Sequence, residues 1–442
     1  MALEAPFFLI NNVINQLKTI SRLLFILLFF TGIAFSQYKN VKINKHDNSP
    51  EEVSVSINPV NPLNIVVGAN LNNNFYTMDG GENWSNSTIS SDDYGVWGDP
   101  CIIFDPNGNT YYFHLSSPPE GKFIDRIVCQ KSTDGGINFN NPGTFTGLNL
   151  PKAQDKAWAC SDWTRHNNLY VCWTQFDKYG SKKPDDHSNI MFSYSTDAGG
   201  SWSIPGKIND TPGDCRDSSN TVEGAVPCTG PDGELYVTWS GPAGIVFNRS
   251  TDAGLTWMDK NKFVCDQVGG WDYEIEGIYR CNGMAVTGCD ISNGPYRGNI
   301  YVNFSDQRNG AGDIDVFLSK STDGGNTWSK PKRVNDDKFG NNKQQFMSWM
   351  CVDPVTGAVN VLFYDRRNYE DNQTDVYLAR STDGGNTFAN IKISDSPFTP
   401  SKGIFFGDYT GISSYNDFAA CVWQRMDKGN LSVIYCGIDF KK

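Results

Sequence analysis

Charged and aromatic residues recur where alternating, strand-like runs of this sequence begin or end. Several runs begin with Asp99 in WGDP, Asp155 and Lys156 in QDKAW, Glu223 in VEGA, and Asp408 with Tyr409 in FGDY. Others end with Asp306 and Arg308 in SDQR, Asp365, Arg366 and Arg367 in YDRR, and Gln424 with Arg425 in WQR. Trp97, Trp158 and Trp423 lie among them. If the fold brings these ends together, they form one charged site with aromatic surfaces.

Such a site has the groups needed to bind and cleave a glycan. A glycosidase uses one protonated carboxyl group at the leaving oxygen and one ionised partner. Arginine binds the carboxylate of an anionic sugar bidentately, and aromatic faces stack on sugar rings. The candidate catalytic residues are Asp99, Asp155, Glu223, Asp306, Asp365, Asp408 and Tyr409. The candidate substrate-binding residues are Lys156, Trp158, Arg308, Arg366, Arg367, Trp423 and Arg425.

A structural interpretation of the same residues stays open. An Asp and an Arg at the end of one strand often form an ion pair within their own sheet, and a carboxylate at the start of a strand often caps a turn. Clustered charges therefore mark a functional site only statistically. The two interpretations differ in whether the side chains face one another across a common opening.

A repeated nine-residue motif predicts the elements that position these residues. KSTDGGNTW (320–328) and RSTDGGNTF (380–388) are two of six copies, whose central aspartates are 55 to 71 residues apart. The six aspartates are Asp79, Asp134, Asp197, Asp252, Asp323 and Asp383. A repeat of this length indicates a modular architecture. Because each motif lies between the third and fourth of four strand-like runs, each unit is predicted to be a four-stranded propeller blade.

The two ends of the mature chain predict how the ring closes. After the sixth motif, residues 405–438 supply three further strands, and YKNVKIN (38–44) resembles a fourth strand with nothing before it. We expect this N-terminal strand to complete the last blade, which gives an all-β, seven-bladed propeller with no bare edge between the chain ends. Six blades is the alternative. The abundance of Gly, at 43 residues, and of aromatic residues, at 13%, is typical of short strands joined by tight turns.

The motif Ser/Thr-x-Asp-x-Gly-x-x-Trp resembles the Asp-box, or BNR repeat, of the sialidase superfamily, and the resemblance covers nearly the whole mature chain. It implies a propeller in which the repeated turn is scaffold. Sialidases of this superfamily usually have six blades, an Arg-Ile-Pro motif, three arginines that bind the sialate carboxylate, an Asp acid/base and a Tyr/Glu nucleophile pair. The nearest match to the first motif here is Arg126-Ile127, without the proline.

The resemblance therefore leaves the activity open. Arg308 and Arg367 could be two of the three arginines and Tyr409 the nucleophile, but no third arginine is placed. The expected function is a glycan-acting propeller, either a sialidase-type glycoside hydrolase on acidic or decorated sugars or a non-catalytic propeller that binds a glycan or a protein.

The N-terminal segment and the charge bound the location and the partners. Lys18 and Arg22 precede an apolar run (23–35), and Ala34 and Ser36 suit a signal peptidase, so residues 1–36 are predicted to be a signal peptide and residues 37–442 one domain. We expect a secreted, periplasmic or cell-surface monomer with no membrane insertion after cleavage. An uncleaved anchor or a misplaced start codon is the alternative, because the stretch before Lys18 is long for a signal peptide. The net charge of −12 argues against nucleic acid as a partner.

Cysteine and histidine give weaker signals. Cys421 with Cys436, and Cys215 with Cys228, are the candidate disulfides among twelve cysteines. Cys101, Cys160, Cys228, Cys289 and Cys351 recur at similar places in successive repeats, which favours buried free thiols. The four histidines have no zinc-site spacing, and no metal or cofactor is expected.

Overall fold

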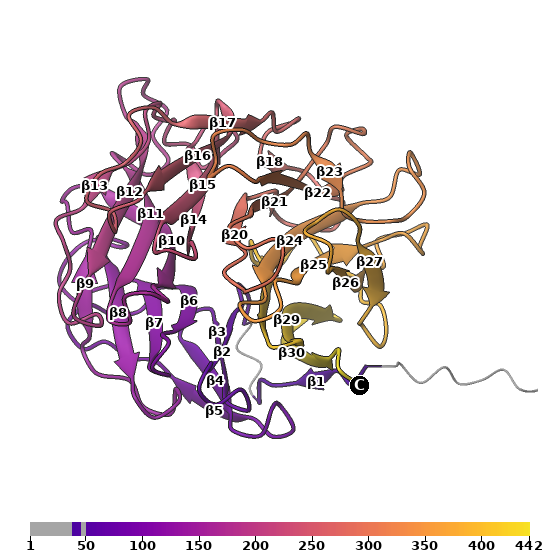
Figure 1. Cartoon of the computed structure of the whole chain (residues 1–442), viewed down its shortest axis with the longest axis horizontal. Coiled ribbons are helices and arrows are strands. Elements are labelled where there is room, and N and C mark those ends of the chain that lie inside the picture. The colour runs from indigo at the N-terminus through magenta and orange to yellow at the C-terminus, as the bar shows by residue number, and fades with distance from the viewer. Residues whose placement is uncertain (1–37, 46–49) are drawn as a thin grey trace, which may run out of the picture. The chain divides into compact units, whose positions relative to one another are not determined.

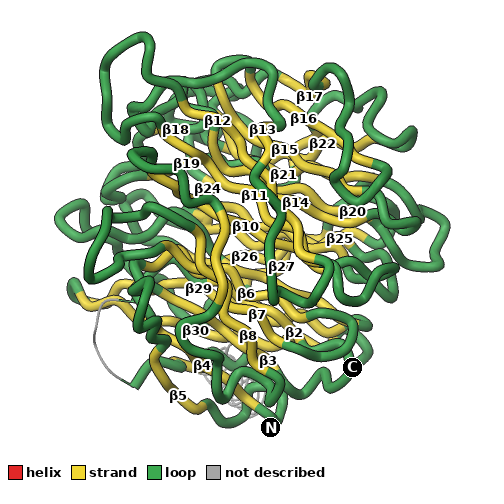
Figure 2. The backbone as a smooth tube through the Cα atoms, turned by 90° about the vertical axis from the view of Figure 1, so that its left-hand side faces the viewer, coloured by secondary structure: helices red, strands yellow, loops and turns green. Residues whose placement is uncertain are grey.

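The computed structural model describes residues 38–45 and 50–442, and these form strands and loops without a helix (Figure 2). Residues Tyr38–Lys442 are one compact unit. Seven sheets of four antiparallel strands form a β-propeller, as Figure 1 shows, which confirms the predicted count of seven blades. The predicted signal peptide lies outside the described residues. Within them, no helix is long and apolar enough to cross a membrane.

The first strand of each blade lies nearest the central axis (Figure 1). Blade 1 consists of β2 (Ser54–Ile57), β3 (Ile65–Ala69), β4 (Asn73–Thr77) and β5 (Ser85–Thr88). Blade 2 consists of β6 (Gly98–Phe104), β7 (Thr110–Leu115), β8 (Ile127–Ser132) and β9 (Thr144–Thr146). Blade 3 consists of β10 (Ala153–Ser161), β11 (Leu169–Phe176), β12 (Ser188–Ser195) and β13 (Gly206–Lys207). Because neighbouring strands are antiparallel, the start of each first strand and the end of each second strand share one face of the propeller.

Blades 4 to 7 repeat this order with one insertion. Blade 4 consists of β14 (Glu223–Thr229), β15 (Leu235–Gly241), β16 (Gly244–Ser250) and β17 (Lys262–Cys265), and blade 5 of β20 (Val286–Cys289), β21 (Ile300–Asp306), β22 (Asp315–Ser321) and β23 (Lys332–Arg333). Blade 6 consists of β24 (Gln345–Val352), β25 (Val359–Asp365), β26 (Asp375–Ser381) and β27 (Ala389–Lys392). Blade 7 consists of β28 (Gly411–Tyr415), β29 (Phe418–Asp427), β30 (Asn430–Asp439) and β1 (Val41–Lys42). Between blades 4 and 5 the chain adds a small sheet of β18 (Asp272–Tyr273) and β19 (Cys281–Asn282).

The N-terminal strand β1 closes the ring, as the sequence predicts. Val41 and Lys42 pair with Tyr435 and Ile434 of β30, so β1 is the outer strand of blade 7. Just beyond it, the Ile43 amide donates to the Val433 carbonyl at 3.0 Å, and the Ile43 side chain is buried against the blade. The two ends of the chain are thus held in one sheet.

Deleting residues 38–44 should lower the melting temperature, because it exposes the edge of β30 and the surface that Ile43 covers. Losing one buried isoleucine alone costs about 1.5 to 3 kcal/mol. The control replaces residues 39–44 by a Gly/Ser sequence of equal length, which keeps the chain but removes the Ile43 side chain. A melting curve unchanged by the deletion would mean that β1 contributes nothing to closure.

The six repeated turns connect the third and fourth strands of blades 1 to 6. In the turn after β22, the Ser321 hydroxyl donates to Asp323 at 2.8 Å and accepts from the Gly325 amide at 2.8 Å, while the Asp323 carboxylate accepts from the Thr327 amide and hydroxyl. Gly325 has φ of 85°, and a Cβ there would lie 2.1 Å from the Phe247 ring. Only glycine therefore fits.

The aromatic residue that ends the motif packs on another blade. Trp257 contacts Phe192 of β12 with ring centroids 4.9 Å apart, and Trp328 contacts Phe247 of β16 at 5.1 Å. Each of these turns therefore ties its own blade to the blade before it. The turns lie on the face opposite the starts of the first strands, which supports their interpretation as scaffold.

Asp323→Ala should lower the free energy of unfolding by about 1 kcal/mol, the net value of hydrogen bonds at a solvent-exposed turn. The hydrogen bonds from Thr327 and Ser321 lower the pKa of this carboxyl to about 2. Their stabilising effect should be present above the ordinary pKa of Asp and be lost as the pH falls toward 2. Urea unfolding at neutral and acidic pH measures both, with Asp259→Ala on the exposed surface as the control. Equal loss in the two variants would contradict the role of the turn.

Neither predicted disulfide is present, because all twelve cysteines are free thiols. Cys421 and Cys436 are direct partners across β29 and β30 but remain unbonded. Cys215 lies in the loop before β14, and Cys228 lies within that strand. The thiols act as small apolar groups, and burial raises their pKa values.

Candidate functional site

The first strands of blades 1 to 4 begin with an irregular turn that brings charged side chains together. Glu52, Asp99 and Lys156 have φ of 55°, 52° and 48°, a left-handed conformation that non-glycine residues rarely adopt. The pairing of the first and second strands shifts register at Asp99 and Lys156 and again after Glu223. Such bulges redirect side chains next to functional sites, and here they lie at the same end of neighbouring strands.

The resulting cluster is called the acidic mouth. Its charged members are Glu51, Glu52, Asp99, Asp155, Lys156, Asp217, Glu223, Arg280 and Asp408. A pocket of about 240 Å³ opens into it and is lined by Glu51, Glu52, Asp99, Asp155, Lys156 and Arg280, with Asn70, Tyr179 and several apolar residues. The structure therefore brings together five of the predicted residues from blades 2, 3, 4 and 7: Asp99, Asp155, Lys156, Glu223 and Asp408.

The two cations of the mouth are bound by carboxylates beneath the pocket. The Lys156 ammonium lies 3.1 Å from Asp408 and 3.8 Å from Glu223. Arg280 donates its Nε to Asp408 at 2.9 Å, pairs with the same carboxylate through Nη2, and donates Nη1 to Asp217 at 3.0 Å. Lys156 and Asp408 are 3% and 1% exposed, so their ion pair lies almost out of contact with water, whereas the side chain of Arg280 is 30% exposed.

Protonation divides the carboxyl groups into two sets. Burial acts to raise the pKa of Asp408, but the charges of Lys156 and Arg280 outweigh it and lower this pKa to about 2. Burial raises the pKa of Asp155 to about 7, although Lys156 lowers it, and burial raises the pKa of Glu51 to about 8. Burial, with the neighbouring Asp217 carboxylate, raises the pKa of Glu223 well above its ordinary value. One mouth thus holds an ionised carboxylate and a carboxyl group that exchanges its proton near neutrality.

Aromatic residues lie both at the opening of the pocket and beneath it. Trp97 and Phe123 line the pocket, are 42% and 48% exposed, and pack edge to face with centroids 4.6 Å apart. Beneath, Trp158 contacts Trp349 and Tyr409, each at 5.4 Å. These three residues come from blades 3, 6 and 7, so their contacts cross the central axis. Trp158 and Tyr409, at 5% and 3% exposed, support the mouth from below rather than line it.

The remaining predicted residues lie elsewhere. Asp306 binds Arg308 through Nε at 2.9 Å, Asp365 binds Arg367 through Nε at 2.7 Å, and Arg425 binds Asp427 at 2.7 Å, all within single blades. These are the in-blade ion pairs of the structural interpretation. None of these residues lines the pocket of the mouth.

Arg366 and Trp423 also lie apart from the mouth. Arg366 is buried, donates Nη2 to the Glu276 carbonyl at 2.8 Å and Nε to Thr374 at 3.1 Å, and lines a separate pocket. Burial lowers the pKa of its guanidinium to about 10. Trp423 is 1% exposed in the apolar core between blades.

Sequence reasoning missed Glu51, Glu52, Asp217 and Arg280. Glu51 and Glu52, in PEEV, directly precede the first strand of blade 1, so they carried the same kind of signal as the predicted residues. Asp217 precedes β14 in an irregular loop. Arg280 belongs to the insertion of β18 and β19, and its partner Asp408 is 128 residues away. The extra length between the fourth and fifth repeated motifs, the longest of the five spacings, was the one available signal for this insertion.

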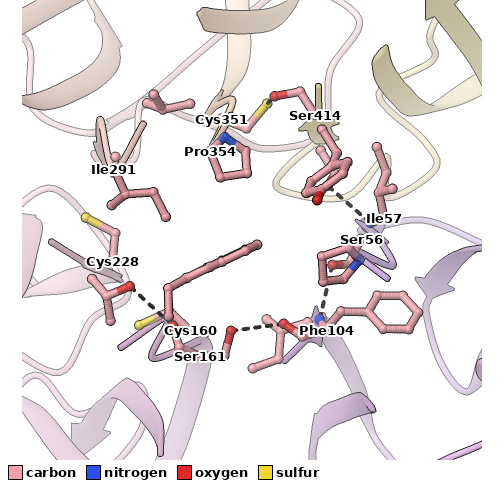
Figure 3. A pocket seen from close by; sticks show the side chains of 18 of the residues that line it. Ser56, Ile57, Phe104, Cys160, Ser161, Cys228, Ile291, Cys351, Pro354 and Ser414 are labelled. Atoms are coloured by element: carbon pink, nitrogen blue, oxygen red, sulfur yellow. Dashed lines mark hydrogen bonds between the residues drawn. The ribbon is translucent and has the colours of Figure 1, made fainter. Parts of the chain in front are cut away.

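A second opening lies at the other ends of the first strands. Figure 3 shows Cys160, Cys228, Cys351 and Ser414 around it, in a pocket of about 270 Å³. Its hydroxyl groups are engaged: Ser161 donates to the Phe104 carbonyl at 2.9 Å, and Ser56 accepts from the Phe104 amide. No carboxyl group lines it. Among the described residues, no group of three or more His, Cys, Asp or Glu is arranged as a metal site.

Comparisons with known proteins bear on the fold alone. No protein-family model and no curated protein matches the chain. Among solved structures, a protein of unknown function from Dyadobacter fermentans is similar over 90% of this chain and 97% of its own, with 11% identity and a TM-score of 0.50. The Hadza microbial sialidase Hz136 is similar over 86% and 73%, with 14% identity and a TM-score of 0.49. Trypanosoma rangeli sialidase in complex with the inhibitor DANA is similar over 92% of this chain but 60% of its own, with 13% identity and a TM-score of 0.47. At 11% identity, the similarity to the Dyadobacter protein supports a shared fold and no more.

Proposed function

We propose that this protein is a glycan-acting propeller whose acidic mouth is a glycoside hydrolase site. One observation carries the proposal: Asp99 and Asp155, from neighbouring blades, line the same pocket, and burial raises the pKa of Asp155 to about 7. A glycosidase needs two carboxyl groups at one pocket, one of which carries a proton at the working pH. Trp97 and Phe123 add aromatic surface at the opening, which suits a sugar ring.

In the proposed roles, Asp155 is the general acid and Asp99 is the carboxylate that faces the reacting carbon. Both line the pocket and come from neighbouring blades. Asp408 is a positioning residue, since it binds Lys156 and Arg280, which line the pocket. The pocket is smaller than the roughly 300 Å³ at which sites enclose a whole drug-sized ligand, which favours one sugar of a longer chain. An anionic sugar is disfavoured, because both cations of the mouth are already paired.

Incubating residues 37–442 with panels of neutral, amino and acidic oligosaccharides tests the proposal. Released sugar, detected as new reducing ends, supports it. If a glycan binds but is not cleaved, the protein is a non-catalytic glycan-binding propeller and the hydrolase proposal is wrong. If no glycan is cleaved or bound, a glycan function is refuted.

A further inference from the structure

The pocket of the acidic mouth is lined by more carboxyl groups than cations. Glu51, Glu52, Asp99 and Asp155 all line it. None of them forms an ion pair with any residue that the structure describes. Asp155 accepts a hydrogen bond from the backbone amide of Lys156 at 2.9 Å, but the ammonium of that lysine is turned to Asp408 and Glu223. All three nitrogens of the Arg280 guanidinium are likewise used by Asp408 and Asp217.

Buried carboxyl oxygens without hydrogen-bond partners lie in the pocket lining and elsewhere in the mouth. Glu51 Oε2, in the lining, lacks a partner. Asp217 Oδ1 and both carboxyl oxygens of Glu223 also lack one, although these two residues do not line the pocket. A buried carboxyl oxygen left unpaired costs free energy comparable to a lost hydrogen bond. Protons supply part of the missing positive charge, since burial raises the pKa values of Glu51, Glu52 and Asp155.

We infer that the acidic mouth takes a cationic ligand, an oligosaccharide whose sugar carries a free ammonium group, and that this group binds among Glu51, Glu52 and Asp99, beside the general acid Asp155. The inference rests on the proposed glycan function and names its substrate class. An ammonium group supplies three hydrogen-bond donors and one positive charge, which are what this pocket lacks. The exposed faces of Trp97 and Phe123 at the opening attract a cation as well as a sugar ring.

Isothermal titration calorimetry with matched oligosaccharides tests the inference. The probes are β-1,4-linked glucosamine oligomers and their N-acetylated counterparts of equal length, measured slightly below neutral pH, where the amine is charged. The amine-bearing oligomer should bind at least about tenfold more tightly, the difference expected for a hydrogen bond between charged groups. The variants Glu51→Gln and Asp99→Asn should each reduce this preference, whereas Glu120→Gln, on an exposed loop, should preserve it.

The outcomes separate this inference from the proposed function. Equal binding or cleavage of the N-acetylated oligomer would overturn the ammonium inference and leave the glycan function intact. Failure of every oligosaccharide to bind or react would overturn both. If oligolysine binds as tightly as the amino sugar, the ligand is a peptide cation. If calcium chloride displaces the amino sugar at low concentration, the pocket is a metal site. Either result contradicts the inference. Circular dichroism of each variant confirms that lost affinity is not lost folding.

Discussion

Asp155→Asn should abolish turnover and preserve glycan binding. Asparagine has nearly the same shape but cannot deliver a proton to the leaving oxygen, and removing a general acid lowers kcat by about 10² to 10⁴-fold. The dissociation constant of the same glycan should change little, because binding does not require proton transfer. Activity of the wild-type protein should also fall as the pH rises through about 7, where burial places the pKa of Asp155, since only the protonated acid is competent.

Asp306→Asn is the matched control for this prediction. Asp306 is buried and is a strand-end aspartate paired with arginine, but it does not line the pocket. It should therefore affect stability and leave kcat per folded molecule unchanged. Full activity of Asp155→Asn, or an inactive but fully folded Asp306→Asn, would show that the acid/base group lies elsewhere. If Asp155→Asn lowers kcat but its residual activity keeps the wild-type pH dependence, the assignment of the general acid to Asp155 is also wrong.

The sequence predicted the fold well because the repeated motif encodes local geometry. Ser321, Asp323 and Gly325 make their hydrogen bonds within one turn, so their spacing in the chain equals their spacing in the structure. Six copies at a blade-length period then predicted the number and order of the strands. The ring closure by residues 38–44 followed because a fourth strand was missing at one end of the chain and present at the other.

The site was predicted only in part, because its contacts are long-range. Asp99, Asp155, Lys156, Glu223 and Asp408 were found because each begins the first strand of its blade or directly precedes it, a position that the repeat makes visible. Arg280 reaches Asp408 from an insertion that breaks the repeat, and no periodicity predicts such a contact.

The arginines failed as predictors of the mouth for a related reason. An Asp and an Arg two residues apart at the end of a strand, such as Asp306 with Arg308, satisfy each other locally. A short spacing between opposite charges therefore predicted an in-blade ion pair better than a ligand site.

Asp408→Asn should lower the free energy of unfolding by about 3 to 5 kcal/mol, the usual cost of removing one partner from a buried ion pair. The carboxylate of Asp408 is the main counter-charge of both Lys156 and Arg280, and its side chain is 1% exposed, so water cannot replace it. The same substitution at Asp427, whose ion pair with Arg425 is half exposed, should cost no more than about 1 kcal/mol.

A double-mutant cycle and the pH dependence give this prediction its sharpest test. Lys156→Met combined with Asp408→Asn should be less destabilising than the sum of the single substitutions, because each removes a charge that the other leaves unpaired. The wild-type protein should lose the contribution of Asp408 as the pH falls from the ordinary pKa of 3.8 toward about 2, its pKa in the folded state, since the lowered pKa stabilises the fold only while the carboxyl is ionised. The Asp408→Asn variant should lack that acidic loss. Additive effects in the cycle, or an acid sensitivity of Asp408→Asn equal to that of the wild-type protein, would mean that the ion pairs with Lys156 and Arg280 do not hold the mouth together. Either outcome would also contradict the positioning role of Asp408.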